Sequence, residues 1–562
     1  MPNNPPPQLS ASPPAGRRRP GWLEPAALGL LLLAEFLTFD RVGARHETWI
    51  YPRWNDQIQY LTEAYLRYEQ YRLHGLVSAL GQCFTTPAAQ GVLHSFYAVL
   101  AFRIAGPSRG AALAVNAVAF LAWQLALFVA VRRAFGSRPL AWAGAGLLLA
   151  LAAPWTVQQG SAFDFRLDWL AANTLGVTLA LALGTEGFRR LVPSLLFGGA
   201  VGITLLTRFL TGTYLALIFA ALLVWILAGP ERGRRARRLL AAAGIAGLVA
   251  GPTFWINRRV IWDYYWIGHF IGPESSIRAS GLGPGGSLVW LIHETGTRQL
   301  GLFWVGWVLA VTGVLAGAAL FFRRVPPDPP GPQRRDAAGL LGPVFLLAPA
   351  LVLGAQPVKS FVVLSALLPG AVVTVLAGWH RLLPRVPRRL PALVAASSLL
   401  AGGGFFAAHM GRNPNTPELE AGARQVLALS DLIYARARAA GLPAPRLGCD
   451  QVTDCLDAQV LRVICYERHG VWIPFQMTMP LGIARAPEAL IMERLRDSDF
   501  LYITVSGPMT GYPWDQELRA MVPATKAWCD AHMRQIAECD LFGQHVLLYQ
   551  RPDLSAMTPA GP

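Results

Sequence analysis

Residues 111–131 read AALAVNAVAFLAWQLALFVAV and are followed directly by Arg132 and Arg133. The stretch contains no charged side chain, and about 20 such residues are needed for a helix to cross a lipid bilayer. Its apolar residues are continuous, whereas the strands of a membrane β-barrel alternate apolar and polar positions. The stretch therefore predicts a transmembrane helix that ends in a positively charged flank.

Comparable stretches recur along the chain and predict a mainly α fold, a polytopic bundle of membrane helices. Of its 562 residues, 53% are hydrophobic and only 15% are charged, and the mean hydropathy is +0.37. A soluble domain typically has about 25% charged residues, so a single soluble domain or a disordered chain is excluded. The eleven expected spans are 24–40, 111–131, 139–156, 168–185, 192–208, 211–229, 239–256, 299–322, 338–355, 360–380 and 390–409.

Two apolar stretches need a separate interpretation. We interpret 88–105 as an interfacial helix that does not cross the membrane, because His94 and Arg103 interrupt it. We interpret 24–40 as an uncleaved anchor and not as a signal peptide. The segment 192–229 must make two crossings with a tight hairpin tip at Arg208 to Thr211.

The formal net charge is +16, and all but two of the 49 basic residues are arginines. The arginines form short clusters between apolar runs and no continuous patch, so we expect no nucleic-acid partner. With eleven spans and a cytoplasmic N-terminus, every cluster lies on one side of the membrane, as the positive-inside rule requires. This predicts a multi-pass protein of the bacterial cytoplasmic membrane with its C-terminus outside the cytoplasm. The clusters are 17–19, 132–138, 189–190, 232–238, 323–335 and 381–389.

We divide the chain into three parts. Residues 1–22 are expected to be a disordered, basic, cytoplasmic N-terminus, and 23–409 a transmembrane domain with outer loops at 41–110 and 257–298. Residues 410–562 are long enough for one extracytoplasmic α/β domain. Its strand-like and helix-like runs are 500–505, 545–549, 417–440 and 514–533.

All six cysteines fall on the predicted outer side, which fits an oxidising compartment with disulfides in the C-terminal part. The connectivity stays open, and Cys529 with Cys539 is one candidate pair. The six are Cys83, Cys449, Cys455, Cys465, Cys529 and Cys539.

Three aspartates at the predicted outer boundary are the candidate catalytic residues. Asp56 lies just beyond the first span, where it can act as a general base toward an acceptor hydroxyl. Asp164 and Asp168 lie at the outer junction of the third and fourth spans, where charges are costly unless they are exposed, paired or functional. The structural alternatives are helix capping by Asp56 or Asp168 and a solvated Asp–Arg pair.

Cations at the same boundary are candidate substrate-binding groups, because arginine contacts phosphate through two parallel hydrogen bonds and lysine supplies a point charge. The alternatives are an interfacial belt with the neighbouring aromatic residues and a snorkelling lysine. The candidates are Arg166, Arg208, Arg258, Arg259, His269 and Lys359.

The order of these features resembles the GT-C membrane glycosyltransferases, specifically the protein O-mannosyltransferase and aminoarabinose-transferase group. The resemblance covers residues 25–385 and depends on short motifs that occur in a fixed order. The motifs are Asp56 after the first span, His94 to Tyr97, Ala111 to Phe135, Asp164 to Asp168 after Pro154, Gly202 to Arg208, and Lys359 ahead of Leu367, Leu368 and Pro369.

The resemblance implies roles for particular residues. Asp56 would be the catalytic base, and Asp164 or Asp168 a second acid of the site. Asn55 stands before Asp56 where the family often has an acidic pair, which departs from the family pattern. His94 joins the substrate-binding candidates through its motif. The residues expected to contact the carrier phosphate are Arg258, Arg259 and Lys359.

The resemblance also implies the reaction. It is the inverting transfer of a hexosyl or pentosyl group from a polyprenyl-phosphate carrier to a glycan, lipid or protein acceptor, and we expect no cofactor and no metal site. One alternative is a transporter or flippase of lipid-linked sugars, which charges deep within several spans would favour; Glu35 is the clearest such residue. The other alternative is a non-catalytic glycan-assembly protein.

Overall fold

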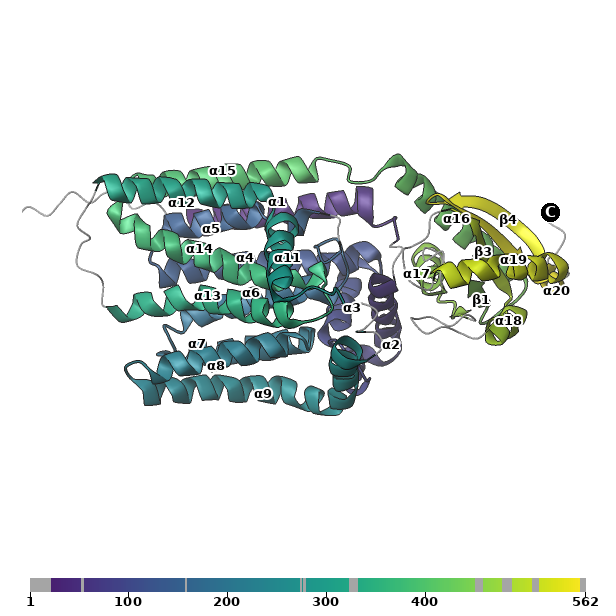
Figure 1. Cartoon of the computed structure of the whole chain (residues 1–562), viewed down its shortest axis with the longest axis horizontal. Coiled ribbons are helices and arrows are strands. Elements are labelled where there is room, and N and C mark those ends of the chain that lie inside the picture. Colours follow the sequence, from purple (N-terminus) through teal and green to yellow (C-terminus); the bar gives the residue numbers. More distant parts are fainter. Residues whose placement is uncertain are drawn as a thin grey trace, which may run out of the picture.

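Long helices lie side by side in the computed structural model of the chain, and a smaller α/β region follows at one end of them (Figure 1). The structure describes residues 22–51, 55–156, 159–272, 275, 279–322, 332–449, 458–477, 488–507 and 515–555. Residues 1–21 of the predicted N-terminal tail, residues 323–331 and Cys455 lie outside the described residues. We call the long helices the bundle and residues 411–555 the C-terminal region.

Helices occupy all eleven ranges that the sequence predicts as spans. They are α1 (Leu23–Val42), α4 (Arg109–Ala134), α5 (Arg138–Leu149) with η2 (Ala153–Trp155), α6 (Leu167–Gly184), α7 (Leu191–Thr207), α8 (Thr211–Leu227), α9 (Arg232–Trp262), α12 (Leu302–Phe322), α13 (Pro332–Ala355), η5 (Phe361–Leu367) with α14 (Leu368–Leu382), and α15 (Leu390–Met410). The segment 192–229 forms two helices, α7 and α8, with a turn at Arg208, as predicted.

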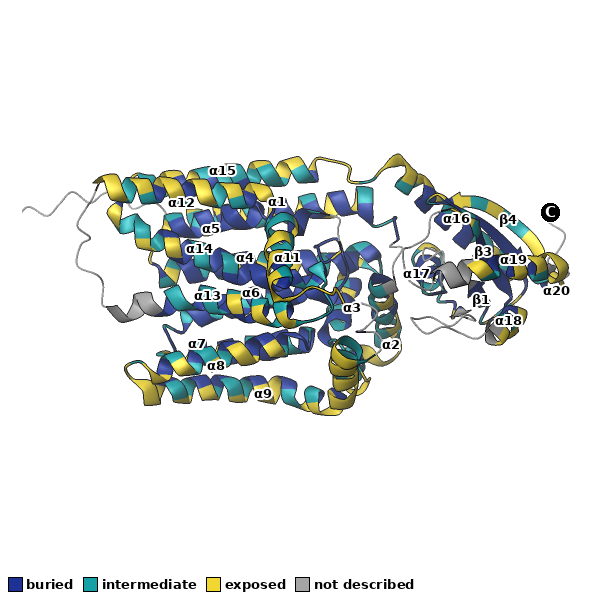
Figure 2. Cartoon of the chain, viewed as in Figure 1, coloured by how far each residue is buried: buried dark blue, intermediate teal, exposed yellow. Residues whose placement is uncertain are grey.

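Seven helical segments of the described chain are at least 18 residues long and apolar enough to cross a membrane. The figure of eleven crossings stays a prediction, because the other helices at predicted spans are not among these seven. The segments are Arg109–Ala134, Leu167–Gly184, Arg232–Ile271, Leu302–Phe322, Ala337–Ala355, Phe361–Arg385 and Leu390–Met410. They differ in burial: α6 lies in the centre, whereas few residues of α12 and α15 are buried and both helices carry exposed leucines such as Leu309 and Leu400 (Figure 2). Exposed apolar faces of this kind are suited to lipid contact.

Small residues let several helix pairs approach closely. A Cβ atom on Gly176 in α6 would lie 2.5 Å from the ring of Trp123 in α4. A Cβ atom on Gly402 in α15 would lie 2.1 Å from the carbonyl oxygen of Gly146 in α5. Within the bundle, Gln124 of α4 also donates a hydrogen bond of 2.6 Å to the buried carboxylate of Glu35 in α1.

Short turns rich in arginine gather at the end of the bundle that is far from the C-terminal region (Figure 1). Glu24 of α1 pairs there with Arg132 at 2.8 Å and with Arg138 at 3.5 Å. Glu231 before α9 pairs with Arg189 after α6 at 2.8 Å. We call this end the arginine-rich end and the opposite end the site end.

Shorter elements cover the site end. They are η1 (Gly43–Glu47), α2 (Asn55–Thr85), α3 (Leu93–Ala105), η3 (Asp263–Ile271), α11 (Pro284–Glu294) and η4 (Thr295–Leu300). The α2 helix lies across the bundle axis, between the bundle and the C-terminal region (Figure 1). It bends at Gly75, whose φ of 80° belongs to the left-handed region that glycine tolerates. The α3 helix has 13 residues and rises about 20 Å, and the interfacial interpretation of 88–105 stays a prediction.

The C-terminal region contains a five-stranded mixed sheet with strand order β2-β1-β3-β5-β4. Strands β1 and β2 pair in parallel with their neighbours, and β3, β5 and β4 are antiparallel. The predicted strands at 500–505 and 545–549 are confirmed as β3 and β5, and the predicted helices at 417–440 and 514–533 as α16 and α19. The elements are α16 (Pro417–Ala439), β1 (Arg446–Cys449), α17 (Ala458–His469), β2 (Gln476–Met477), α18 (Glu488–Arg496), β3 (Phe500–Ser506), α19 (Asp515–His532), β4 (Arg534–Leu541), β5 (Gln544–Gln550) and α20 (Pro552–Ser555).

The candidate disulfide between Cys529 and Cys539 is wrong for this structure, in which both are free thiols, as are Cys83 and Cys465. Cys529 is fully buried at the end of α19, while Cys539 lies on the edge strand β4 among partly exposed side chains. Nearness in sequence suggested the pair, but the helix and the strand direct the two side chains to different surroundings.

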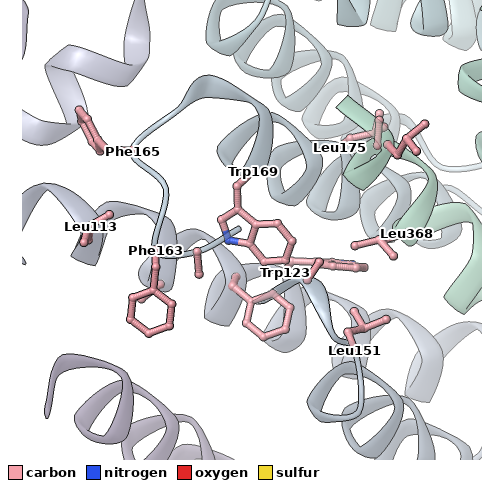
Figure 3. Close-up of a cluster of buried hydrophobic side chains, with 14 of the residues drawn as sticks. Leu113, Trp123, Leu151, Phe163, Phe165, Trp169, Leu175 and Leu368 are labelled. Carbon is pink, nitrogen blue, oxygen red and sulfur yellow. The ribbon is translucent and has the colours of Figure 1, made fainter. Parts of the chain in front are cut away.

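Buried aromatic side chains pack together around the loop that precedes α6 (Figure 3). Trp123 and Trp169 are almost completely buried, and both rings lie within 5.8 Å of Phe120. Phe163 and Phe165 anchor the loop before α6: Phe163 stacks on Phe39 of α1 at 4.5 Å. Because these large apolar groups are buried on both sides of the loop, its polar residues are held in fixed positions.

Candidate active site

Asp56, Arg166 and Asp164 form a continuous line of charges at the site end. Asp56 lies in the first turn of α2, and Arg166 and Asp164 lie in the loop that precedes α6. The Arg166 guanidinium is 3.5 Å from the carboxylate of Asp56 and 3.2 Å from that of Asp164. Two aspartates that are 108 residues apart in sequence therefore share one arginine.

Asp164 is the most firmly held member of this line. Its carboxylate accepts hydrogen bonds from the backbone N–H of Gly160 at 2.5 Å and from the side chain of Gln57 at 3.0 Å. Asn116, a buried polar residue within α4, donates to the carbonyl oxygens of Ala162 and Asp164. Burial raises the pKa of Asp164 to about 6, although the charge of Arg166 acts in the opposite direction.

Asp168 and Arg208 form a second ion pair close to the first line. Their charged atoms are 2.9 Å apart, and the charges of Arg166 and Asp56 also act on Asp168. The alternative of a solvated ion pair does not describe Asp168, because the side chains of Asp168 and Arg208 are both nearly buried. Asp168 lies within the first turn of α6 and is not its N-cap residue. We call Asp56, Asp164, Arg166, Asp168 and Arg208 the charged cluster.

A short loop segment, residues 90–92, holds Arg208 in place. The N–H of Phe209 donates to the carbonyl of Gln90, and the N–H of Val92 donates to the carbonyl of Leu206. The Gln90 side chain then accepts hydrogen bonds from Arg208 at 3.1 Å and from the hydroxyl of Tyr60 in α2 at 2.7 Å. The turn between α7 and α8 is thereby tied to α2.

Aromatic groups surround Arg208 on its other sides. The charge of Arg208 acts on Tyr60, Tyr214, Tyr264 and Tyr265. The buried hydroxyl of Tyr214 has no hydrogen-bond partner within the described chain, whereas that of Tyr265 interacts with the backbone of Leu210. An unpaired buried hydroxyl is costly, so the Tyr214 hydroxyl is available to a polar ligand.

His94 also lies beside the charged cluster. Its ring is 3.9 Å from that of Phe165, in the loop before α6, and 5.7 Å from that of Tyr60. Neither ring nitrogen has a hydrogen-bond partner among the residues that the structure describes. Burial lowers the pKa of His94 to about 3, so the imidazole is neutral and can either donate or accept a hydrogen bond.

The members of the cluster differ in their access to solvent. The side chain of Asp56 is 46% exposed, whereas those of Asp164 and Asp168 are 4% and 6% exposed. Arg166 and Arg208 are also nearly buried, at 9% and 11%. Asp56 is therefore the one carboxylate of the charged cluster that an incoming molecule can reach directly.

The remaining predicted site residues lie apart from the charged cluster. Arg258 and Arg259 are on an exposed face of α9, where the guanidinium of Arg258 stacks on Trp255. His269 bonds the carbonyl of Tyr264 at 2.8 Å and therefore lies next to the tyrosines around Arg208. Lys359 donates hydrogen bonds to the carbonyls of Gly354 and Gln356 at 2.7 and 2.6 Å, which caps the end of α13.

The sequence did not single out Gln57, Gln90 or Arg109. Arg109 begins α4, is buried, and donates a hydrogen bond of 3.2 Å to Gln57. An arginine just before the uncharged stretch 111–131 was a usable signal, whereas the two glutamines carried none. In the described ranges, no three His, Cys, Asp or Glu side chains are grouped as ligands for a metal ion.

The bundle, with its charged cluster at one end and an α/β region beyond it, has the GT-C membrane fold. A solved structure with this fold is that of the aminoarabinose transferase ArnT from Cupriavidus metallidurans in the apo state, with a TM-score of 0.61 and 16% identity over 96% of this chain and 100% of that one. The same protein bound to undecaprenyl phosphate gives 0.59 and 16% over 97% and 100%.

A further similar structure is the arabinofuranosyltransferase AftD from Mycobacteria. It gives a TM-score of 0.51 and 13% identity, and the match covers 94% of this chain but 40% of that one. No family model matches the chain, and no curated protein matches it in sequence. The predicted fold class and the predicted resemblance are therefore confirmed at the level of the fold.

Proposed function

We propose that this chain is a glycosyltransferase that moves a sugar from a polyprenyl-phosphate carrier to an extracytoplasmic acceptor, with Asp56 as the general base. The observation that carries the proposal is the exposed carboxylate of Asp56, held by the nearly buried Arg166 at one end of a membrane bundle. The GT-C fold agrees with this, since the similar structures are those of two sugar transferases.

The donor phosphate is assigned to Arg208 and its surroundings. Arg208 is a nearly buried guanidinium near the unpaired hydroxyl of Tyr214, and such donors bind a phosphate strongly when water is excluded. An ArnT structure similar to this chain contains undecaprenyl phosphate, which supports a lipid carrier of this class. Lys359, Arg258 and Arg259 keep the donor-contact role only as a prediction, because their present contacts are structural or lie on an exposed face.

In the proposed reaction, the Asp56 carboxylate accepts the proton of an acceptor hydroxyl while the hydroxyl oxygen attacks the anomeric carbon. The bond between that carbon and the carrier phosphate breaks, and the phosphate leaves with the electron pair. Arg208 stabilises the negative charge that develops on the leaving phosphate. Attack from the side opposite the leaving group inverts the anomeric configuration, and no cofactor is needed because the donor is already activated.

The two ends of the bundle support a proposal for the sidedness of the protein. The arginine-rich end lies opposite the charged cluster, and arginine-rich turns favour the cytoplasmic side of a membrane. We therefore assign the site end and the C-terminal region to the extracytoplasmic side of the bacterial cytoplasmic membrane. This places the cluster where a lipid-linked sugar and an extracytoplasmic acceptor can meet.

The test compares lipid-linked sugars and surface glycans in cells that lack the gene and carry a plasmid copy. The wild-type copy is expected to restore glycan modification, while Asp56→Asn should leave the donor accumulated and the acceptor unmodified at normal protein abundance. Asp40→Asn, which removes an exposed carboxylate near the end of α1, is the matched control and should behave as wild type. Full complementation by Asp56→Asn would remove Asp56 from the mechanism, and donor trapped on the inner leaflet would indicate a flippase.

A further inference from the structure

Glu467 lies where the C-terminal region touches the site end. It belongs to α17, which packs against α2. The hydroxyl of Tyr51 donates to Oε2 of Glu467, and the hydroxyl of Tyr65 donates to Oε1. Both tyrosines are buried, at 8% and 0% exposure, so their hydroxyls depend on this carboxylate for a partner.

The two tyrosines stand on either side of Asp56 in the sequence. Tyr51 comes five residues before Asp56, and Tyr65 follows nine residues after it, nearly three turns into α2. A single carboxylate therefore holds the chain on both sides of the candidate base. The ring of Tyr65 also stacks on Phe102 of α3 at 4.9 Å, which fixes the direction of its hydroxyl.

A second connection runs from Glu467 through Arg109. The charge of Arg109 acts on Glu467, and its backbone also bonds that carboxylate. The Arg109 guanidinium donates to the carbonyls of Glu47 and Ile50 and to the side chain of Gln57. Gln57 in turn bonds Asp164, which shares Arg166 with Asp56.

We propose that Glu467 is a positioning residue of the transferase, through which the C-terminal region holds the first turns of α2 and sets the position of Asp56. The proposal rests on the proposed function of the charged cluster. A group held about 1 Å away from its productive position can lose about a hundredfold in rate, so loosening α2 affects turnover more than donor binding. On this proposal, the C-terminal region contributes a positioning residue to the active site.

The test substitutes Glu467→Gln, which keeps the shape of the side chain but removes its charge. Sugar transfer by the purified full chain is expected to fall about tenfold or more, whereas binding of undecaprenyl phosphate changes less than about twofold. Asp431→Asn is the matched control: it breaks ion pairs to Arg468 and His469 of the same helix α17 but does not touch α2. Its transfer rate should equal that of wild type.

Two further measurements separate positioning from a loss of folding. In a Tyr51→Phe, Tyr65→Phe background, Glu467→Gln should cost little more, because both hydroxyls that the carboxylate holds are already absent. Hydrogen exchange of the α2 amides at 56–66 should rise in Glu467→Gln and stay unchanged in Asp431→Asn. The exchange measurement does not depend on sugar transfer, so it tests the contact between Glu467 and α2 even if Asp56→Asn transferred sugar normally. Unchanged hydrogen exchange together with unchanged transfer in Glu467→Gln would overturn the inference.

Discussion

Asp56, Asp164 and Asp168 share one cluster, but their surroundings separate their roles. Asp56 is open to solvent and is therefore the member that can accept a proton from a visiting hydroxyl. Asp164 and Asp168 are nearly buried, and each is paired with an arginine. Their task in the proposed reaction is to orient Arg166 and Arg208, since a buried carboxylate cannot approach the acceptor.

The raised pKa of Asp164 predicts an acid limit to activity. Burial raises this pKa to about 6, so Asp164 is charged above that pH and neutral below it. Protonation removes the ion pair with Arg166, and transfer should therefore fall as the pH is lowered through about 6. The measurement is the transfer rate between pH 4.5 and 8, and Asp164→Asn should be slow throughout and lack the step.

Glu47 provides the control for that profile, because burial raises its pKa to about 7 and it lies near Arg109 outside the charged cluster. Glu47→Gln should keep the step near pH 6, and a step that disappears with Glu47 instead of Asp164 would contradict the assignment. For stability the sign is opposite: a folded-state pKa above the ordinary value means that Asp164 stabilises the fold less as the pH rises from about 4 to 6.

At the residue scale, the sequence predicted the charges and not their partners. The aspartates and Arg166 were identifiable because charges at a membrane boundary are unusual. The pairing of Asp168 with Arg208 joins the start of α6 to the turn after α7, 40 residues further along the chain, and the roles of Gln57 and Gln90 arise only once such segments meet. Contacts of this kind depend on tertiary packing, which no local pattern encodes.

At the scale of elements, the loop segment Gln90 to Val92 connects α2 to the turn that bears Arg208. Gly91 makes this possible: a Cβ atom there would lie 2.1 Å from the carbonyl oxygen of Thr207. The segment and the turn cannot easily move apart, because backbone hydrogen bonds join Val92 to Leu206 and Gln90 to Phe209. The close approach therefore requires a residue without a side chain.

Gly91→Ala should push the segment away from the turn and release Gln90 from Arg208. Overpacking of this kind costs about 1–3 kcal/mol, so the melting temperature in detergent should fall by several degrees. Binding of undecaprenyl phosphate should weaken as well, because Arg208 loses a fixed partner. Gly81→Ala in α2, where a Cβ atom meets nothing within 4 Å, should leave both quantities unchanged; equal effects of the two changes would count against the role of Gly91.

Element positions followed from the sequence wherever an apolar run was long. All eleven expected ranges are helical, and the hairpin turn lies at Arg208 as predicted, because hydropathy alone sets the place of such helices. Two features could not be predicted from the sequence: the pairing of 90–92 with the α7–α8 turn and the π-helical segment η3 that follows α9. Both depend on packing at the site end, where sequence periodicity is weak.

For the whole molecule, the separation of the two ends predicts a fixed orientation. Alkaline phosphatase, which is active only outside the cytoplasm, should be active when fused after Pro562 and inactive when fused after Gly233 in the arginine-rich end. The reason is the positive-inside rule applied to the turns that carry the arginines. An active Gly233 fusion together with an inactive Pro562 fusion would show the opposite orientation and contradict the extracytoplasmic assignment of the site end.

The hydrogen bond between Glu35 and Gln124 has a consequence for how the protein is made. The two residues are 89 positions apart, so α1 leaves the ribosome well before α4 can supply the amide. With α1 as a membrane span, as the sequence predicts, a carboxylate facing lipid would cost about 2.5–3.5 kcal/mol. We therefore expect the insertion machinery to retain the first helix until the helix that shields its carboxylate has been synthesised.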